Sequence, residues 1–440
     1  MSELWHHGDV MSERKDLTAK VEADGAAGED IDVKEKLSER SFCTFVITQF
    51  LGAFNDNAFK QLMLLVAVDL AIEKEAAYYQ PLAGAVFAIP FVLLSGFAGS
   101  LADRFSKTSI IRFCKVWEVL VMLLGGAAFY IENIPLLFFT LFLMGAQSAF
   151  FGPGKYGIVP ELIPEGRLVK ANGIILMTTY LAITLGTASS GLLKDALEDD
   201  GGLYRIQGFL VLLAVLGTLA ALGIRRMPVA QPELEIRGKI LGDLRPTLVD
   251  IFADRSFRSV ALTYAYFWGL GAALLMLCNS YGKILMGLED WPTSMLLVCL
   301  SVGISLGAFG GGLVSRGKVD FRIYRMGLLL LLASMVALGW AHQDVFTARA
   351  ALFVLGLAGG MFALPLQTSI QLWSRENLRG RVMGSVNFLC FVCIFLASGI
   401  FLLARLWIPI EWIGASLAGL TALVHLFARR GLSMAARDLS

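Results

Sequence analysis

The chain is 440 residues long, and 56% of its residues are hydrophobic whereas only 17% are charged. Its mean hydropathy of +0.68 excludes an ordinary soluble or disordered protein and indicates a membrane protein. The formal net charge is +1, but charged residues are confined to short runs between long apolar ones. Net charge therefore says little about partners, and no nucleic-acid partner is expected.

The first forty residues differ from the rest of the chain. They are rich in Glu, Asp, Lys and Gly, with few apolar positions after Trp5. We expect residues 1–40 to be a disordered cytoplasmic tail. No charged leader with a short apolar core and a small-residue cleavage site is present, so the first long apolar segment, from about Ser41, is expected to remain as an uncleaved helix.

Twelve apolar segments, each about as long as the roughly 20 residues needed to cross hydrocarbon, predict an all-α membrane protein. The expected helices are 42–70, 78–101, 109–131, 135–153, 173–193, 204–224, 257–285, 293–314, 322–341, 346–367, 381–405 and 410–428. Lys and Arg concentrate after the second, fourth, sixth, eighth and tenth segments. By the positive-inside rule, both termini are expected in the cytoplasm.

The first expected helix carries a polar cluster, Asn55-Asp56-Asn57 and Lys60. Asp56 and Lys60 are four residues apart, which places them on one helical face where they can pair. A charge in hydrocarbon costs on the order of 3 kcal/mol, so these side chains should face a cavity or a partner. The cluster contains more polar groups than one ion pair needs, which favours a substrate-binding role over a purely structural pair.

Between the second and third helices lies Gly99-Ser-Leu-Ala-Asp103-Arg104-Phe-Ser-Lys107. An ordinary positive loop would explain Arg104 and Lys107, but it would not explain the glycine and the acid. The run resembles the signature of the major facilitator superfamily. The resemblance implies that fold, with twelve helices in two six-helix halves, and a gating role for Asp103, Arg104 and Lys107 as the halves rock.

Two further sites carry charge inside expected helices. Lys115 and Glu118 are three residues apart in helix three, so a mutual ion pair is the simplest interpretation, with a substrate or proton role for Glu118 as the alternative. Helix four is expected to break near Gly152-Pro153-Gly154, with Lys155 projecting from the break. Lys155 is then either a gating residue or an ordinary interfacial lysine.

A polar stretch divides the chain into two expected bundles. Residues 225–255 contain Pro228, Pro232 and Pro246 among mixed charges and read as a cytoplasmic linker between bundles at 41–224 and 256–428, with a cytoplasmic tail at 429–440. The halves echo one another weakly, because Gly99-Ser-Leu-Ala-Asp-Arg before helix three resembles Gly311-Gly-Leu-Val-Ser-Arg before helix nine. Such repetition is expected of a duplicated transporter fold.

The second half has fewer charges within its helices. Asn279, Gln367 and Asn387 are candidates for lining a cavity, with interhelical hydrogen bonding as the alternative for each. The six cysteines lie in apolar contexts and are expected to be packing residues, with no metal and no cofactor. Acyltransferase, nucleophile-elbow and adenylate-forming motifs are absent, so we expect a transporter rather than an enzyme.

A narrower resemblance rests on several motifs, which together are similar to the bacterial lysophospholipid transporter family and to the membrane domain of acyltransferase/acyl-acyl carrier protein ligase fusion proteins. The motifs are Gln49-Phe-Leu-Gly-Ala-Phe-Asn-Asp56-Asn-Ala58, Gly154-Lys155-Tyr-Gly-Ile158, Glu161-Leu162, Leu168-Val-Lys-Ala-Asn-Gly173 and Phe267-Trp-Gly269. The resemblance implies a monomeric flippase that moves lysophospholipids from the outer to the inner leaflet of the bacterial inner membrane. It also implies re-acylation by such a ligase, Asp56 near the headgroup and Lys155 in a charged gate.

The chain departs from that family at one place. Members carry an arginine shortly after Phe-Trp-Gly, whereas Leu274-Leu275-Met276 stand here. Lys60 or Lys283 is a candidate for the missing positive charge. A proton-coupled exporter of a small solute or drug remains the alternative function, with Asp56 or Glu118 as the titrating group.

Overall fold

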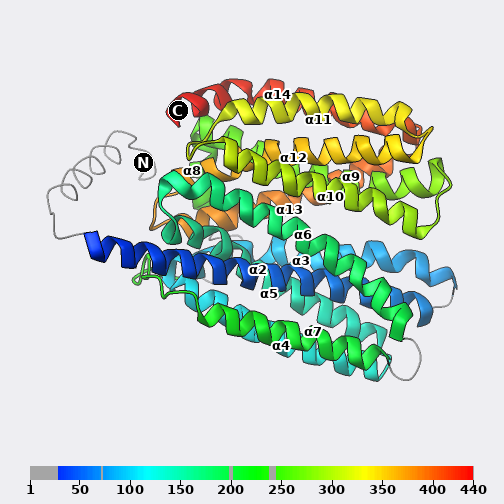
Figure 1. Cartoon of the computed structure of the whole chain (residues 1–440), viewed down its shortest axis with the longest axis horizontal. Coiled ribbons are helices and arrows are strands. Elements are labelled where there is room, and N and C mark those ends of the chain that lie inside the picture. The colour runs from blue at the N-terminus through cyan, green and yellow to red at the C-terminus, as the bar shows by residue number, and fades with distance from the viewer. Residues whose placement is uncertain (1–27, 71–72, 198–201, 237–243, 440) are drawn as a thin grey trace.

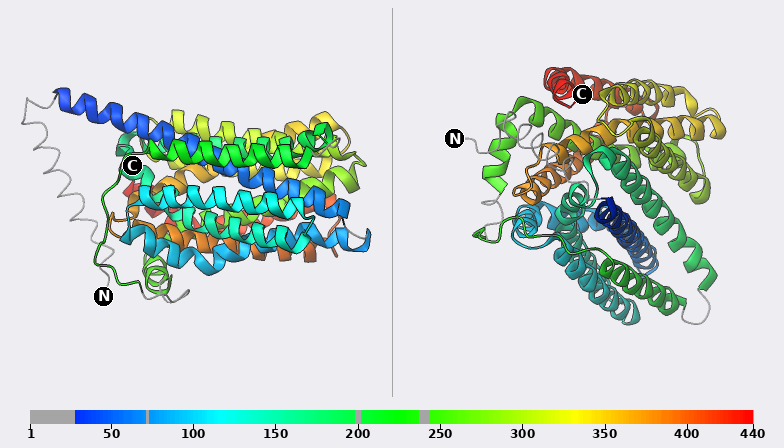
Figure 2. Two further views of the ribbon diagram at one scale, coloured as in Figure 1. Left: turned by 90° about the horizontal axis from the view of Figure 1, so that it is seen from below. Right: turned by 60° about the vertical axis from the view of Figure 1, so that its left-hand side comes forward.

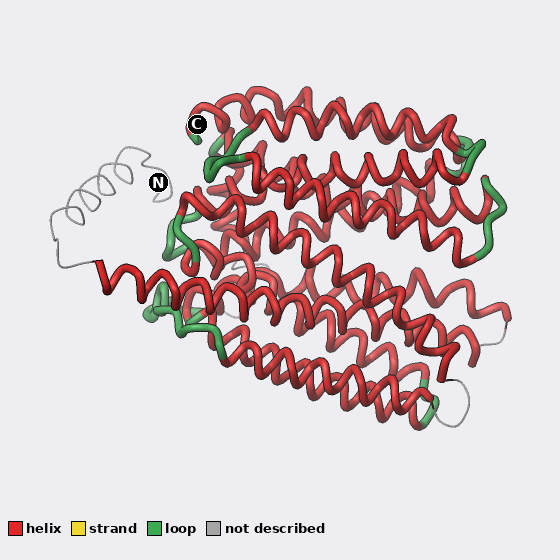
Figure 3. The backbone as a smooth tube through the Cα atoms, viewed as in Figure 1, coloured by secondary structure: helices red, strands yellow, loops and turns green. Residues whose placement is uncertain are grey.

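A computed structural model describes residues 28–70, 73–197, 202–236 and 244–439. Every regular element in these residues is a helix (Figure 3). The helices are α2 (Gly28–Leu70), α3 (Glu73–Arg104), α4 (Lys107–Tyr130), α5 (Ile134–Leu162), α6 (Glu165–Leu197), α7 (Gly202–Leu222), α8 (Leu244–Ala253), α9 (Arg255–Ser280) with the π-helical turn η1 (Tyr281–Leu285), α10 (Asp290–Val314), α11 (Phe321–Ala341), α12 (Val345–Trp373), α13 (Arg379–Ala404) and α14 (Ile410–Asp438).

The long helices follow the expected apolar segments in order. Ten of them, within the described residues, are long and apolar enough to cross a membrane. The other two long helices, α2 and α4, run beside these ten along the bundle (Figure 1). They carry the polar cluster around Asp56 and the Lys115–Glu118 pair. The count of twelve spans therefore stays a prediction, because composition alone does not assign α2 and α4 to the membrane.

Several boundaries differ from the expected ones. Residues 28–40 of the expected tail form the beginning of α2, and residues 1–27 lie outside the described part of the chain. The C-terminal tail from residue 429 continues α14 to Asp438. Polar residues extend these helices beyond the apolar segments, so hydropathy alone underestimates their lengths.

The expected break in the fourth helix is wrong. The α5 helix runs without interruption from Ile134 to Leu162 and contains Pro153. Proline removes one backbone hydrogen bond, but neighbouring helices can accommodate it in a membrane helix. Pro153 is buried between Gly152 and Gly154, which have no side chains to crowd its ring.

The helices form two halves, α2 to α7 and α9 to α14. They are joined at the end of the bundle that also holds both described chain ends, called here the linker end (Figure 1). Helix α3 packs against α13, and α6 packs against α10, across the boundary between the halves. The halves lie close together at the linker end and diverge toward the opposite end (Figure 1).

The segment that joins the halves is ordered on both sides of residues 237–243, which are not described. Residues 223–236 run along the linker end, and α8 lies across that end beside α13 and α9 (Figure 2). Ser106 Oγ donates to the carbonyl of Met227 (2.7 Å), and Arg104 Nη1 donates to the carbonyl of Leu234 (2.8 Å). These bonds fasten the segment to the end of α3 and the start of α4.

Candidate functional site

A cavity of about 280 Å³ lies between the two halves, near the middle of the long helices. Its walls come from α2, α3, α4, α5 and α6 of the first half and from α9, α12 and α13 of the second. The two sides differ in chemistry. The charged side chains come from α2, α4 and α5, whereas aromatic and aliphatic side chains dominate the walls formed by α3, α9 and α13. A pocket at the interface of two repeats is where transporters of this architecture bind substrate.

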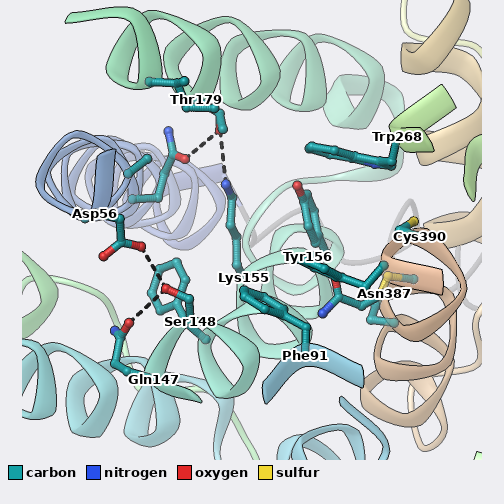
Figure 4. Close-up of a pocket in the computed structure, with 18 of the residues that line it drawn as sticks. Asp56, Phe91, Gln147, Ser148, Lys155, Tyr156, Thr179, Trp268, Asn387 and Cys390 are labelled. Carbon is teal, nitrogen blue, oxygen red and sulfur yellow. Dashed lines mark hydrogen bonds between the residues drawn. The ribbon is translucent and has the colours of Figure 1, made fainter. Parts of the chain in front are cut away.

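Asp56 lies on the polar side of the cavity (Figure 4). Its Oδ2 accepts a hydrogen bond from Ser148 Oγ of α5 (2.7 Å), and the same hydroxyl lies 3.0 Å from Gln147 Oε1. Its Oδ1 is buried without a hydrogen-bond partner in the protein. One carboxylate oxygen is thus fixed by α5, and the other is enclosed by protein without a hydrogen-bond partner.

Lys155 also lines this side of the cavity. Its Nζ donates to Thr179 Oγ1 of α6 (3.0 Å), and that hydroxyl is bonded to Gln49 Oε1 of α2 (2.8 Å) (Figure 4). The ammonium also lies 5.2 Å from the ring centroid of Tyr156. The structure therefore places Lys155 in the cavity wall and ties three helices of the first half together through it.

Lys115 and Glu118 are almost fully buried, with side-chain exposures of 1% and 2%. Lys115 Nζ pairs with Glu118 Oε2, and Glu118 Oε1 accepts from Asn55 Nδ2 of α2 (3.1 Å). The ammonium fits closely between helices because Gly52 and Gly217 have no side chains there. Asn55 therefore faces α4 rather than the cavity, although Lys115 and Glu118 reach the cavity wall.

Lys60 lines the cavity one turn beyond Asp56 on α2. Its Nζ lies 5.6 Å from the ring centroid of Phe87 of α3. The expected direct pairing with Asp56 is not formed, since no Lys60–Asp56 salt bridge within 4.0 Å is present in the described structure. Asn57 also lines the cavity, with its amide bonded to the carbonyl of Ala53 (2.8 Å).

The apolar side of the cavity is built from α3, α9 and α13. The rings of Phe91 and Phe391 stack across the boundary between the halves, with centroids 3.9 Å apart. Further lining residues on this side are Trp268 and Cys390 (Figure 4), together with Met383, Val386 and Ile394. Gln367 and Asn387 add the few polar groups here, and Asn387 Nδ2 donates to Ser95 Oγ of α3 (3.2 Å).

The halves are held together at the linker end by Asp103, whose exposure is 0%. Its carboxylate accepts from the backbone N–H groups of Gly380 (2.6 Å) and Arg381 (3.0 Å) at the start of α13. It also accepts from Arg381 Nε (3.1 Å). A carboxylate at a helix N-terminus is well placed, because that end presents unpaired N–H donors and a partial positive charge.

Three more contacts lie at this end. Lys107 Nζ lies 2.6 Å from Glu161 Oε1, and Arg379 Nη1 of the second half lies 3.7 Å from the same oxygen. Arg381 Nη2 donates to Gln231 Oε1 of the linker (2.6 Å). Of the three expected gating residues, Asp103 thus contacts the second half directly, Lys107 contacts it through Glu161, and Arg104 binds the linker.

A buried amide cluster lies between the cavity and the linker end. Asn172 Nδ2 of α6 donates to Thr368 Oγ1 (3.1 Å) and to Gln371 Oε1 of α12. Gln367 Nε2 donates to Asn172 Oδ1 (3.4 Å). Each of these side chains has an exposure of 3% or less. The uncharged bonds join the halves without burying an unpaired charge.

Asn279 is the expected site residue that lies farthest from this arrangement. It is near the end of α9, away from the linker end, and does not line the cavity. From the sequence, no site role is expected for Gln49, Gln147, Ser148 and Thr179, or for Glu161, Arg379 and Arg381, although Gln49 and Glu161 stand in the motifs that carry the family resemblance. The sequence does contain a signal for Gln49, Gln147, Ser148 and Thr179, because polar side chains within otherwise apolar helices should face a partner or a cavity.

Comparison with known proteins gives both a family and relatives. The model of the Major Facilitator Superfamily matches residues 45–398. Lysophospholipid transporter LplT of Photorhabdus laumondii is 27% identical over 398 residues, which are 89% of this chain and 95% of that protein. LplT of Serratia proteamaculans is 29% identical over 343 residues, 76% of this chain and 81% of that protein. The human organic anion transporter MFSD10 has a similar fold, with a TM-score of 0.74 at 14% identity over 89% of this chain and 99% of that one.

Proposed function

We propose that this chain, which belongs to the Major Facilitator Superfamily, is a lysophospholipid transporter that works by alternating access between its two halves. The supporting observation is the two-sided cavity. Asp56 and its polar neighbours suit a charged headgroup, and the aromatic wall around Phe91 and Phe391 suits an acyl chain. The named function of the two LplT relatives supports the same substrate.

The cavity volume of about 280 Å³ lies near the lower limit of the roughly 300–1,000 Å³ that enclose a drug-sized ligand. It accommodates a headgroup and the first part of an acyl chain, and the remainder of the chain extends toward lipid. We place Asp56 and Lys155 in the headgroup site with Lys60, Asn57, Gln367 and Asn387. Asn55 and the Lys115–Glu118 pair join α2 to α4 and support that site from its α4 side.

We further propose that the protein lies in the bacterial inner membrane with the linker end and both termini in the cytoplasm. The contacts of Asp103, Lys107 and Arg104 would then form a cytoplasmic gate, which is closed in this structure. Flux would run from the outer to the inner leaflet, where an acyltransferase/acyl-acyl carrier protein ligase re-acylates the product. The protein would act as a monomer, without catalytic chemistry of its own.

The test is transport of labelled lysophosphatidylethanolamine in proteoliposomes without ATP. Wild type is expected to move the lipid, and Asp56→Asn is expected to lose at least about tenfold in rate, equivalent to about 1.4 kcal/mol. Lys155→Ala should also lose activity, since it removes the ammonium that joins α5 to α6.

Empty vesicles and an imposed pH gradient are the controls. Equal lipid movement with and without protein would reject the lysophospholipid function. Proton-driven movement of a small solute combined with indifference to lysolipid would establish the exporter instead.

A further inference from the structure

The three lysines that line the cavity differ in their partners. Lys115 pairs with Glu118, and Lys155 donates to Thr179. Lys60 forms no salt bridge within 4.0 Å and no hydrogen bond in the described structure; its Nζ lies 5.6 Å from the centroid of the Phe87 ring, and Asp56 acts on it only through a longer-range charge interaction. The positive charge of an ammonium held against an aromatic ring is partly stabilised by the ring. The ammonium can still donate three hydrogen bonds.

Lys60 stands at a particular place in the cavity. It is the last charged lining residue of α2 on the side away from the linker end, toward which the halves diverge (Figure 1). Helix α2 rises by about 6 Å over the four residues from Asp56 to Lys60. A negative and a positive group therefore stand in sequence along one helical face, the carboxylate deeper and the ammonium nearer the open end.

This order matches a zwitterionic headgroup. In a lysophosphatidylethanolamine the ammonium is terminal, the phosphate follows it, and the glycerol and acyl chain come last. With the ammonium at the Asp56 carboxylate, which lines the cavity, the phosphate reaches Lys60. The chain then turns back along Phe87 to the Phe91–Phe391 stack, which lies one turn of α3 closer to the linker end.

The geometry points to Lys60 as the residue that recognises the substrate phosphate, an assignment that rests on the proposed lysophospholipid function. Lys60 supplies the positive charge at a different place from the segment after Phe267-Trp-Gly269 on α9, where Leu274 is buried among apolar side chains. Lys283, the other candidate cation, lies in η1 and does not line the cavity. Lys60 thus selects phosphate-bearing single-chain lipids over neutral ones.

Binding of two lipids with the same acyl chain tests this assignment in the full chain reconstituted in nanodiscs. Palmitoyl lysophosphatidylethanolamine carries the phosphate, and monopalmitoylglycerol does not. Wild type should prefer the phospholipid by at least tenfold. Lys60→Gln should lose this preference while still binding monopalmitoylglycerol, whereas Lys60→Arg and the control Lys283→Gln should keep it.

A third lipid tests the polarity of the headgroup. Lysophosphatidic acid has the phosphate but no ammonium, so its affinity should fall at least tenfold in Lys60→Gln and stay within about twofold in Asp56→Asn. The opposite ranking of the two variants would overturn the proposed orientation.

The outcomes separate the two proposals. A wild-type protein that binds neither phospholipid would reject the lysophospholipid function itself. A wild-type preference that persists undiminished in Lys60→Gln would overturn the assignment of Lys60 alone. If Lys60→Gln does not fold, Lys60→Arg decides, because loss of the phosphate preference in a folded arginine variant also overturns it.

Discussion

Single residues of the cavity show how far local spacing informs a site. The four-residue spacing predicts that Asp56 and Lys60 share a helical face, and both line the same cavity. Their neighbours are Ser148 and Phe87, on other helices. The cost of charge in hydrocarbon makes a cavity predictable from sequence. The identity of a partner ninety residues away depends on packing that no short motif encodes.

The buried pair Lys115–Glu118 gives a prediction at this scale. Replacing Glu118 by Gln should lower the free energy of unfolding by roughly 3–5 kcal/mol, because it leaves the Lys115 ammonium buried without a counter-charge. The double variant Lys115→Met/Glu118→Leu should recover most of this loss, since it buries no charge. Thermal unfolding in detergent measures all three proteins. A single variant as stable as wild type would show that water reaches this pair.

At the scale of helices, glycines set how closely the halves approach. A Cβ at Gly99 of α3 would lie 2.8 Å from the carbonyl oxygen of Gly380 of α13, and one at Gly173 of α6 would lie 2.7 Å from that of Ala308 of α10. Small residues of this kind allow backbones to meet in membrane proteins. The sequence indicates the role of Gly99 through its motif. It gives no sign that the facing helix supplies Arg381 to Asp103.

Gly384 of α13 tests this contact between helices. A Cβ there would overlap the carbonyl oxygen of Ser95 on α3, a backbone atom that cannot move alone. Gly384→Ala should therefore separate α3 from α13 at the linker end and lower the transport rate several-fold. Gly399→Ala on the same helix is the matched control, because no heavy atom lies within 4 Å of its added Cβ.

Thiol labelling of a cysteine introduced at Ala102 reports directly whether α3 and α13 have separated at the linker end. It is measured together with transport. Labelling of Ala102→Cys should increase in the Gly384→Ala background and not in the Gly399→Ala background. Unchanged labelling and unchanged transport in both would mean that the helices adjust elsewhere and that this close approach is dispensable.

The whole molecule is asymmetric along the helices. Close contacts between the halves involve residues 166–177 of α6 and residues 305–317 of α10 and the turn that follows it, while the halves diverge toward the far end (Figure 1). Two halves are predictable from the weak internal repeat and the proline-rich linker. Their relative tilt is not, because alternative packings of the same helices differ by only a few kcal/mol and ligands shift the balance between them.

The antiparallel register of α6 and α10 turns this asymmetry into a cross-linking prediction. A Cβ at Gly312 lies 3.3 Å from the Cα of Lys170, so Lys170→Cys/Gly312→Cys should form a disulfide at the linker end. Ala188→Cys/Ser294→Cys continues the same helical faces toward the far end, about 16 Å along α6 from Met177. In a background without the six native cysteines, the first pair should oxidise readily without substrate and abolish transport until reduced. The second pair should remain reduced unless substrate closes the far end, and equal oxidation of both pairs without substrate would contradict an arrangement that is closed at the linker end alone.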